Sequence, residues 1–370
     1  MNAIEFRNVY KSYGEHEVLA DISFDVRENE FFVIFGPSGA GKTTILKLIA
    51  GLDYVDSGSI FVDGKDATVM PAAKRGVRMA FENYALYPHL TVFENMAGPL
   101  RNNKLPMKEI KERVEQCATT LGIRDYLNRL PRELSGGQRQ RVSLGRSIVA
   151  EARVYLLDEP LAHLDAKLRH ELRTEFQNIK SFLGNSTVVY VTHDYLEAMG
   201  MADRVCVLAD KQIQQIDTPK NIYDHPINVD TALMFGYPPI NLLNMKVDKD
   251  RRFIFSDEVK LGPFSGELAE QLSKYDKEEI IYGVRPRNCM FSFEDRSRDG
   301  YIKGEVIGFE INNFRGILLV LSESSGLLSI LCDRFLNVTP GADVFLKPDI
   351  SGGSFFDATT KKNLKYQGDK

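Results

Sequence analysis

The segment GPSGAGKTT at positions 36–44 has the residue types and the spacing of a loop that binds phosphate. Glycines let backbone N–H groups close around phosphate oxygens, and the helix that follows adds the positive end of its dipole. Lys42 is expected to neutralise the β- and γ-phosphates, and the Thr43 hydroxyl to hold Mg²⁺. The predicted nucleotide-binding residues of this loop are Gly36, Pro37, Ser38, Gly39, Ala40, Gly41, Lys42, Thr43 and Thr44.

Two adjacent acids follow a predicted buried strand in the segment YLLDEP at 155–160. Open parallel sheets present their catalytic groups at the carboxyl ends of their strands. Asp158 is suited to the coordination shell of Mg²⁺, and Glu159 to orienting and deprotonating a water molecule aimed at the γ-phosphate. With the phosphate loop in the same chain, this pair predicts Mg²⁺-dependent hydrolysis of a nucleotide at its γ-phosphate, with Glu159 as a catalytic residue.

A second anion-binding turn is predicted in LSGGQRQR at 134–141. Its Ser-Gly-Gly turn leads into a helix, so several N–H groups gather at a second helix N-terminus. One γ-phosphate does not need two such loops from a single subunit. We therefore expect this turn to serve a nucleotide held by another subunit, through Ser135, Gly136, Gly137 and Gln138.

Short buried strands alternate with amphipathic helices up to about residue 235, which predicts an α/β fold with a sheet between helices. The expected strands are 31–35, 154–157, 187–191 and 204–208. Apolar residues recur at spacings of three and four within 107–121 and 168–183, and this spacing predicts two helices.

The stretch FGYPPINLL at 235–243 breaks this alternation with glycine and two prolines, which indicates a domain boundary. Four short strand-like pieces in the remaining chain are EIIYGV, YIKGEVIGF, GILLVL and LLSILC. They predict a small barrel or sandwich of β-strands. The predicted domains are therefore 1–235 and 236–370.

The composition is typical of a globular protein with no affinity for nucleic acid. The chain has 370 residues, 43% of them hydrophobic and 26% charged, and a formal net charge of -4. Without a basic field, we expect no nucleic-acid partner. We also expect no secretory signal and no membrane helix, because no apolar run reaches the required length. Four widely spaced cysteines predict reduced, mostly buried thiols.

This ordered set of motifs resembles the nucleotide-binding subunits of ABC transporters. In that family the loop at 36–44, the LSGGQRQR turn and the VYLLDEP strand are the phosphate loop, the signature sequence and the metal and base strand. VTHD at 191–194 resembles the switch-histidine segment, so the resemblance makes His193 catalytic. LAHLD at 161–165 is similar to the D-loop and implies a nucleotide contact from Asp165. Tyr13 stands where an aromatic side chain stacks on adenine.

Further segments look like the maltose-type carbohydrate importer ATPases, among them YALYPHLTVFENM at 84–96 and YGVRPRN at 282–288. The resemblance implies an ABC ATPase domain with a RecA-like core and a helical subdomain, followed by an all-β, OB-like (TOBE) regulatory domain. It implies ATP and Mg²⁺ as cofactors and two ATPase subunits facing head to tail. It also implies two transmembrane permease subunits, an extracytoplasmic solute-binding protein acting indirectly, and a peripheral location at the cytoplasmic face of the cell membrane. A sugar or oligosaccharide is the favoured cargo.

Glu82 departs from the family pattern, because it stands where the Q-loop has a glutamine that reaches Mg²⁺ or the attacking water. A carboxylate only accepts hydrogen bonds and adds negative charge near the γ-phosphate. Glu82 could ligate Mg²⁺ directly, or a protonated acid could imitate the amide. Alternatively, the chain is the catalytically weakened partner in a heterodimeric pair, or Glu82 was introduced deliberately to slow the ATPase cycle. Ala162 and His163 in the D-loop, which replace serine and asparagine, favour an asymmetric partner.

Two other functions compete with transport. A soluble ABC ATPase acting on nucleic acid or ribosomes should have a second phosphate loop, a long coiled coil or a basic tail, and this sequence has none. In a signalling module, the C-terminal barrel would mainly serve regulation by sequestering a transcription factor. The identity of membrane partners would separate transport from both.

Overall fold

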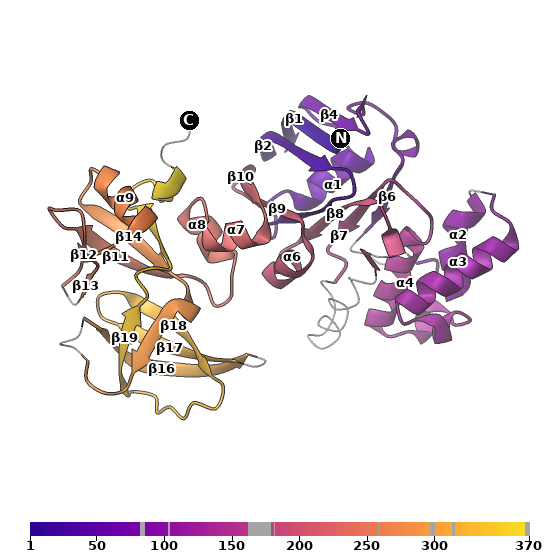
Figure 1. Cartoon of the computed structure of the whole chain (residues 1–370). Helices are drawn as coiled ribbons and strands as arrows, with labels where there is room; N and C mark the ends of the chain where they lie inside the picture. Colours follow the sequence, from indigo (N-terminus) through magenta and orange to yellow (C-terminus); the bar gives the residue numbers. More distant parts are fainter. Residues whose placement is uncertain are drawn as a thin grey trace. The chain divides into compact units, whose positions relative to one another are not determined.

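The computed structural model describes residues 1–81, 86–102, 104–161, 179–180, 182–257, 259–296, 300–312 and 315–366. Its contacts divide the chain into two compact units, Met1–Lys220 and Asn221–Lys370 (Figure 1). The sequence analysis placed a boundary after residue 235, whereas the segment 221–235 belongs to the second unit by its contacts. Each unit has its own buried hydrophobic core.

A six-stranded sheet forms the centre of the first unit. Its strands, in spatial order, are β10 (Gln212–Asp217), β9 (Arg204–Ala209), β3 (Phe31–Phe35), β8 (Thr187–Thr192), β7 (Val154–Asp158) and β6 (Val77–Ala80). All neighbours pair in parallel except β10, which pairs antiparallel with β9. The four predicted strands are confirmed as β3, β7, β8 and β9, with ends that agree to within one residue.

The central strands are apolar on both faces, as expected where helices cover both sides of a parallel sheet. Every residue of β3, β7 and β8 is buried. The carboxyl ends of these strands lie side by side, because Phe35 pairs with Thr192 and Asp158 pairs with Val191. The segments that follow the three strands therefore meet at one edge of the sheet.

An antiparallel sheet in the first unit was not predicted. Its strands, in spatial order, are β2 (His16–Arg27), β1 (Asn2–Tyr13), β4 (Ser57–Val62) and β5 (Lys65–Asp66). The ring of Phe24 stacks on Phe6 with centroids 4.6 Å apart and on Phe32 of β3 at 5.6 Å. These aromatic contacts join the antiparallel sheet to the parallel one in a single core.

Among the described residues, the helices of the first unit are α1 (Lys42–Ala50), α2 (Val92–Asn102), α3 (Met107–Thr120), α4 (Gly136–Ile148) and α6 (Tyr195–Met201). The apolar spacing within 107–121 correctly predicted α3, whose buried face contains Ile110, Val114 and Cys117. The helices α2, α3 and α4 pack against one another as a helical subdomain (Figure 1). Most of the helix predicted within 168–183 lies outside the described residues.

The second unit contains two five-stranded antiparallel sheets, which confirms the predicted β-rich C-terminal region. The first sheet, in spatial order, consists of β13 (Lys260–Leu261), β12 (Ile254–Phe255), β11 (Asn241–Val247), β14 (Glu279–Val284) and β20 (Gly353–Asp357). The second consists of β15 (Cys289–Ser292), β19 (Asp343–Pro348), β16 (Ile302–Asn312), β17 (Arg315–Ser322) and β18 (Gly326–Asp333). The four strand-like sequence pieces correspond to β14, β16, β17 and β18.

Three short or peripheral helices accompany these sheets. They are α7 (Pro219–Asp224), which carries the chain from the first unit into the second, α8 (Val229–Met234) and α9 (Gly266–Lys274). The 3₁₀ turns in the part of the chain that the structure describes are η1 (Ala72–Lys74), η2 (Arg124–Tyr126), η3 (Pro131–Glu133), η4 (Pro286–Asn288) and η6 (Leu364–Tyr366).

All four cysteines are free thiols, and three of them are buried, as predicted. Burial raises the pKa of Cys117 and of Cys206 to about 12, so both thiols stay protonated at neutral pH. Across the ranges that the structure describes, no helix combines the length and the apolar character that crossing a membrane requires.

Candidate active site

The predicted phosphate loop connects the end of β3 to the start of α1, as the sequence indicated. A side chain on Gly36 would collide with the backbone carbonyl oxygen of Leu208 in the neighbouring strand β9. Gly39 and Gly41 have φ angles of 81° and 98°, a left-handed region that favours glycine. Gly41 is also the N-cap of α1. The loop therefore requires these glycines to place its N–H groups at the helix N-terminus.

Lys42 is held inside this loop. Its ammonium group donates hydrogen bonds to the carbonyl oxygens of Gly36 and Pro37, both at 3.0 Å. The same nitrogen lies 3.4 Å from Oε1 of Glu159, and only 5% of Lys42 is exposed. A desolvated cation at this position interacts strongly with a phosphate group, because the local dielectric constant is low.

Thr43 and Asp158 meet between the loop and the end of β7. The Thr43 hydroxyl donates a hydrogen bond of 3.0 Å to Oδ1 of Asp158, whose side chain is almost completely buried. A hydroxyl and a carboxylate are hard oxygen ligands of the kind that Mg²⁺ prefers, and Mg²⁺ takes its remaining ligands from phosphate and water. The two residues therefore fit a magnesium site.

The Glu159 carboxylate contacts both Lys42 and His193. Its Oε1 faces Lys42, and its Oε2 lies 2.8 Å from Nδ1 of His193. Glu159 has a φ angle of 42°, and its N–H donates to the carbonyl oxygen of Val191 at 3.1 Å. That bond fixes the backbone of Glu159 against the end of β8. The Glu159 carboxylate then lies between the Lys42 ammonium group and the His193 ring.

His193 remains half-exposed on the far side of Glu159, with 49% of its side chain accessible. The segment that carries it is anchored by Glu197, a buried acid in α6 that the sequence analysis did not identify. Oε2 of Glu197 accepts hydrogen bonds from the hydroxyls of Tyr190 at 2.8 Å and Thr192 at 2.7 Å. Burial and this carboxylate raise the pKa of Tyr190 well above its usual value, so Tyr190 remains a donor.

Tyr13 lies at the end of β1, and 47% of it is exposed. Its hydroxyl donates to Oδ2 of Asp53 at 2.5 Å, and the ammonium group of Lys11 lies 5.0 Å from its ring centroid. Burial and the bond to Asp53 raise the pKa of Tyr13, while the Thr44 hydroxyl of the phosphate loop has the opposite effect. The structure therefore holds an exposed aromatic ring near the loop. Asp53 and Lys11 were not identified from the sequence.

The signature turn forms a separate helix N-terminus. Ser135 caps α4: its hydroxyl accepts from the N–H of Gln138 at 3.2 Å, and the Gln138 side chain accepts from the N–H of Ser135 at 2.9 Å. Gly136 has open space where a side chain would stand. Within the part of the chain that the structure describes, no hydrogen bond or ion pair joins Ser135–Gln138 to the phosphate loop.

The structure therefore brings together five of the predicted residues, Lys42, Thr43, Asp158, Glu159 and His193, at one edge of the sheet. Two other predicted residues, Glu82 and Asp165, lie outside the described residues, as do Ala162 and His163. Gln140 was missed by the sequence analysis. It is buried in α4 and donates from its amide to the carbonyl oxygen of Pro160, which follows Glu159.

A phosphate loop after the central parallel strand β3, with an Asp-Glu pair at the end of β7, two strands away in the same sheet, defines a nucleoside triphosphate hydrolase. Residues 19–162 match the family model described as ABC transporter. The uncharacterized ABC transporter ATP-binding protein YurJ of Bacillus subtilis is 38% identical over 369 residues, which cover 98% of this chain and 99% of that one. The chain belongs to the ABC transporter ATP-binding proteins. It is therefore an ATPase.

Two relatives have names that state what they import. The oligosaccharides import ATP-binding protein MsmX of Bacillus subtilis is 36% identical over a region that covers 99% of this chain and 100% of that protein. The trehalose/maltose import ATP-binding protein MalK of Thermococcus litoralis is 43% identical over 295 residues, or 78% of this chain and 79% of that protein.

Proposed function

We propose that this chain powers the import of a sugar or oligosaccharide by an ABC transporter. The observation that carries the proposal is the similarity to MsmX, which extends over 99% of the chain and thus through both structural units. The identity of 43% with the trehalose/maltose protein MalK supports the same class of cargo.

In this proposal the cluster at the sheet edge performs the hydrolysis. Lys42 binds the β- and γ-phosphates, and Glu159 orients a water molecule and accepts its proton. His193 holds the second oxygen of Glu159 and thereby keeps the carboxylate aimed at that water. Thr43 and Asp158 would hold Mg²⁺, which, when bound, neutralises charge on the phosphates. The ring of Tyr13 would stack on the adenine.

The signature turn would act on a second ATPase subunit. Ser135, Gly136, Gly137 and Gln138 form a partly exposed helix N-terminus with no bond to the chain's own phosphate loop in the described residues. Such a terminus binds anions, so it suits the γ-phosphate of a nucleotide on the facing subunit. Asp165 would contribute from the D-loop. ATP would then hold two subunits together, and hydrolysis would release them.

Two transmembrane permease subunits would receive this motion at the cytoplasmic face of the membrane, and a solute-binding protein outside would deliver the cargo.

The proposed domains are an ATPase domain at 1–235 and an OB-like regulatory domain at 236–370. Glu82 supports a second candidate, in which the chain is the weaker ATPase of a heterodimeric pair, because a carboxylate replaces the usual amide there.

Purification from native membranes tests the proposal and separates the two candidates. The tagged full chain is expected to bring down two permease subunits, and mass spectrometry is expected to find this chain as the sole ATPase subunit, in two copies. A second, different ATPase subunit in equal amount would favour the heterodimer. Recovery of ribosomal or nucleic-acid components in place of permeases would contradict transport.

A further inference from the structure

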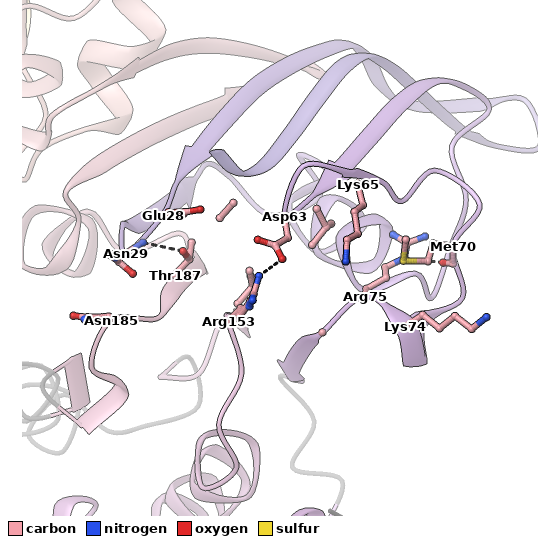
Figure 2. Close-up of a pocket in the computed structure, with 14 residues that line it drawn as sticks. Glu28, Asn29, Asp63, Lys65, Met70, Lys74, Arg75, Arg153, Asn185 and Thr187 are labelled. Atoms are coloured by element: carbon pink, nitrogen blue, oxygen red, sulfur yellow. Dashed lines mark hydrogen bonds and ion pairs between the residues drawn. The ribbon is translucent and has the colours of Figure 1, made fainter. Parts of the chain in front are cut away.

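A cavity of about 490 Å³ lies at the end of the central sheet opposite the phosphate loop (Figure 2). Its lining includes Val154 and Thr187, the first residues of β7 and β8, and Gly76, which precedes β6. The phosphate loop follows the carboxyl end of β3, so the cavity and the ATPase site lie at opposite edges of the same sheet. The volume is within the range of pockets that bind small metabolites.

Basic side chains outnumber acidic ones in this cavity. The charged lining residues are Lys65, Lys74, Arg75 and Arg153 on the basic side and Glu28 and Asp63 on the acidic side. Asp63 already forms an ion pair with Arg153. Figure 2 shows Glu28 at the opposite end of the lining from Lys65, Lys74 and Arg75. The cavity therefore has an excess of two positive charges in a protein with a net charge of -4.

No acid among the described residues forms an ion pair with the three cations at one end. Within the ranges that the structure covers, Lys65 and Lys74 form no ion pair. Arg75 is only 5% exposed, and its hydrogen bonds go to neutral carbonyl oxygens: Met70 at 2.8 Å, Leu48 at 2.6 Å and Ile49 at 3.1 Å. Burial lowers the pKa of Arg75, because no carboxylate compensates its desolvation.

The guanidinium of Arg75 also has a hydrogen-bond donor without an acceptor among the described residues. Its Nη2 atom is buried and has no hydrogen-bond partner among the described residues. A buried donor without a partner costs free energy that a bound acceptor can recover. The bonds to Leu48 and Ile49 hold Arg75 at the last turn of α1, so the cation has a fixed position. The end of α1 explains two of its hydrogen bonds, those to Leu48 and Ile49, but not the adjacent lysines or the cavity.

We propose that this cavity binds a small organic phosphate, independently of the nucleotide. A phosphate monoester is close to a dianion at neutral pH and matches the excess of two positive charges. Lys65 and Arg75 form the phosphate end of the site, and Lys74 adds positive charge at its outer rim (Figure 2). Lys and Arg side chains bind phosphate by charge-assisted hydrogen bonds. Asn29 and Asn185, at the other end of the lining, provide amide groups for a polar body such as a sugar (Figure 2).

Isothermal titration with glucose 6-phosphate tests this site. The full chain is first saturated with ADP and Mg²⁺, so that the phosphate loop is occupied and cannot bind the probe. We expect binding with a Kd below about 1 mM, and no binding of glucose itself. The double substitution Lys65→Gln with Lys74→Gln is expected to weaken binding at least about tenfold. Arg75 is left in place because it holds the end of α1.

The matched control is Lys108→Gln with Lys111→Gln, which removes the same charge from exposed positions on α3. It is expected to bind glucose 6-phosphate as the unmodified chain does. The proposal is wrong if glucose 6-phosphate does not bind at about 10 mM, or if the Lys65/Lys74 variant and the control bind equally well. Both binding measurements use the chain without permease subunits. Their outcome therefore does not depend on whether the proposed function in sugar import is correct.

Discussion

Replacing Glu159 by glutamine is expected to lower ATP hydrolysis by about 10²- to 10⁴-fold while ATP binding persists, because an amide cannot accept the proton of the attacking water. The substitution keeps the shape of the side chain between Lys42 and His193, whose contacts with the carboxylate are 3.4 and 2.8 Å. Phosphate release measures hydrolysis, and a fluorescent ATP analogue measures binding. The ATP-bound form should therefore accumulate.

Glu112→Gln provides the control, since it removes the same charge from an exposed position on α3. This variant should hydrolyse ATP at the normal rate. If Glu159→Gln retained more than about a tenth of the normal rate, another group would have to accept the proton, and the role given to Glu159 would be wrong.

Removing the ammonium group with Lys42→Ala is expected to reduce the ATPase rate by at least about 10²-fold and to weaken ATP binding as well. In the proposed mechanism Lys42, unlike Glu159, contacts the phosphates before and during the reaction, so both ATP binding and ATP hydrolysis are expected to weaken. Equilibrium binding of ATP, measured beside the steady-state rate, distinguishes the two substitutions.

Lys42 donates to two carbonyl oxygens of its own loop, and the thermal unfolding midpoint therefore has to be recorded for the variant. Lys108→Ala, at an exposed position, controls for the loss of charge. Normal ATP affinity in a folded Lys42→Ala protein would show that the ammonium group does not bind the phosphates.

Motifs that combine unusual residue types with fixed spacing were the part of the site that the sequence could predict. The glycines at 36, 39 and 41 are required by backbone geometry, and the acids at 158 and 159 follow a strand whose burial is visible in its composition. Central parallel strands are apolar throughout, so β3, β7, β8 and β9 were found with nearly correct ends.

The supporting contacts were not predicted, because they join ordinary residues far apart in the chain. Tyr13 depends on Asp53, and neither residue type nor spacing marks that pair. Glu197 resembles a surface acid in its helix, yet it is buried beneath the histidine segment. The strands β1, β2 and β4 were also missed, and the register shifts in the pairs β1–β2 and β1–β4 interrupt the regular alternation of their faces.

Uptake of radiolabelled oligosaccharides into proteoliposomes tests the central claim most directly. The vesicles would contain this chain with the permease subunits that co-purify with it, the native solute-binding protein outside and Mg-ATP inside. We expect accumulation of sugar that requires ATP and is lost in the Glu159→Gln protein. ATP hydrolysis without any sugar uptake, or uptake that Glu159→Gln leaves unchanged, would contradict the claim that this site drives sugar import.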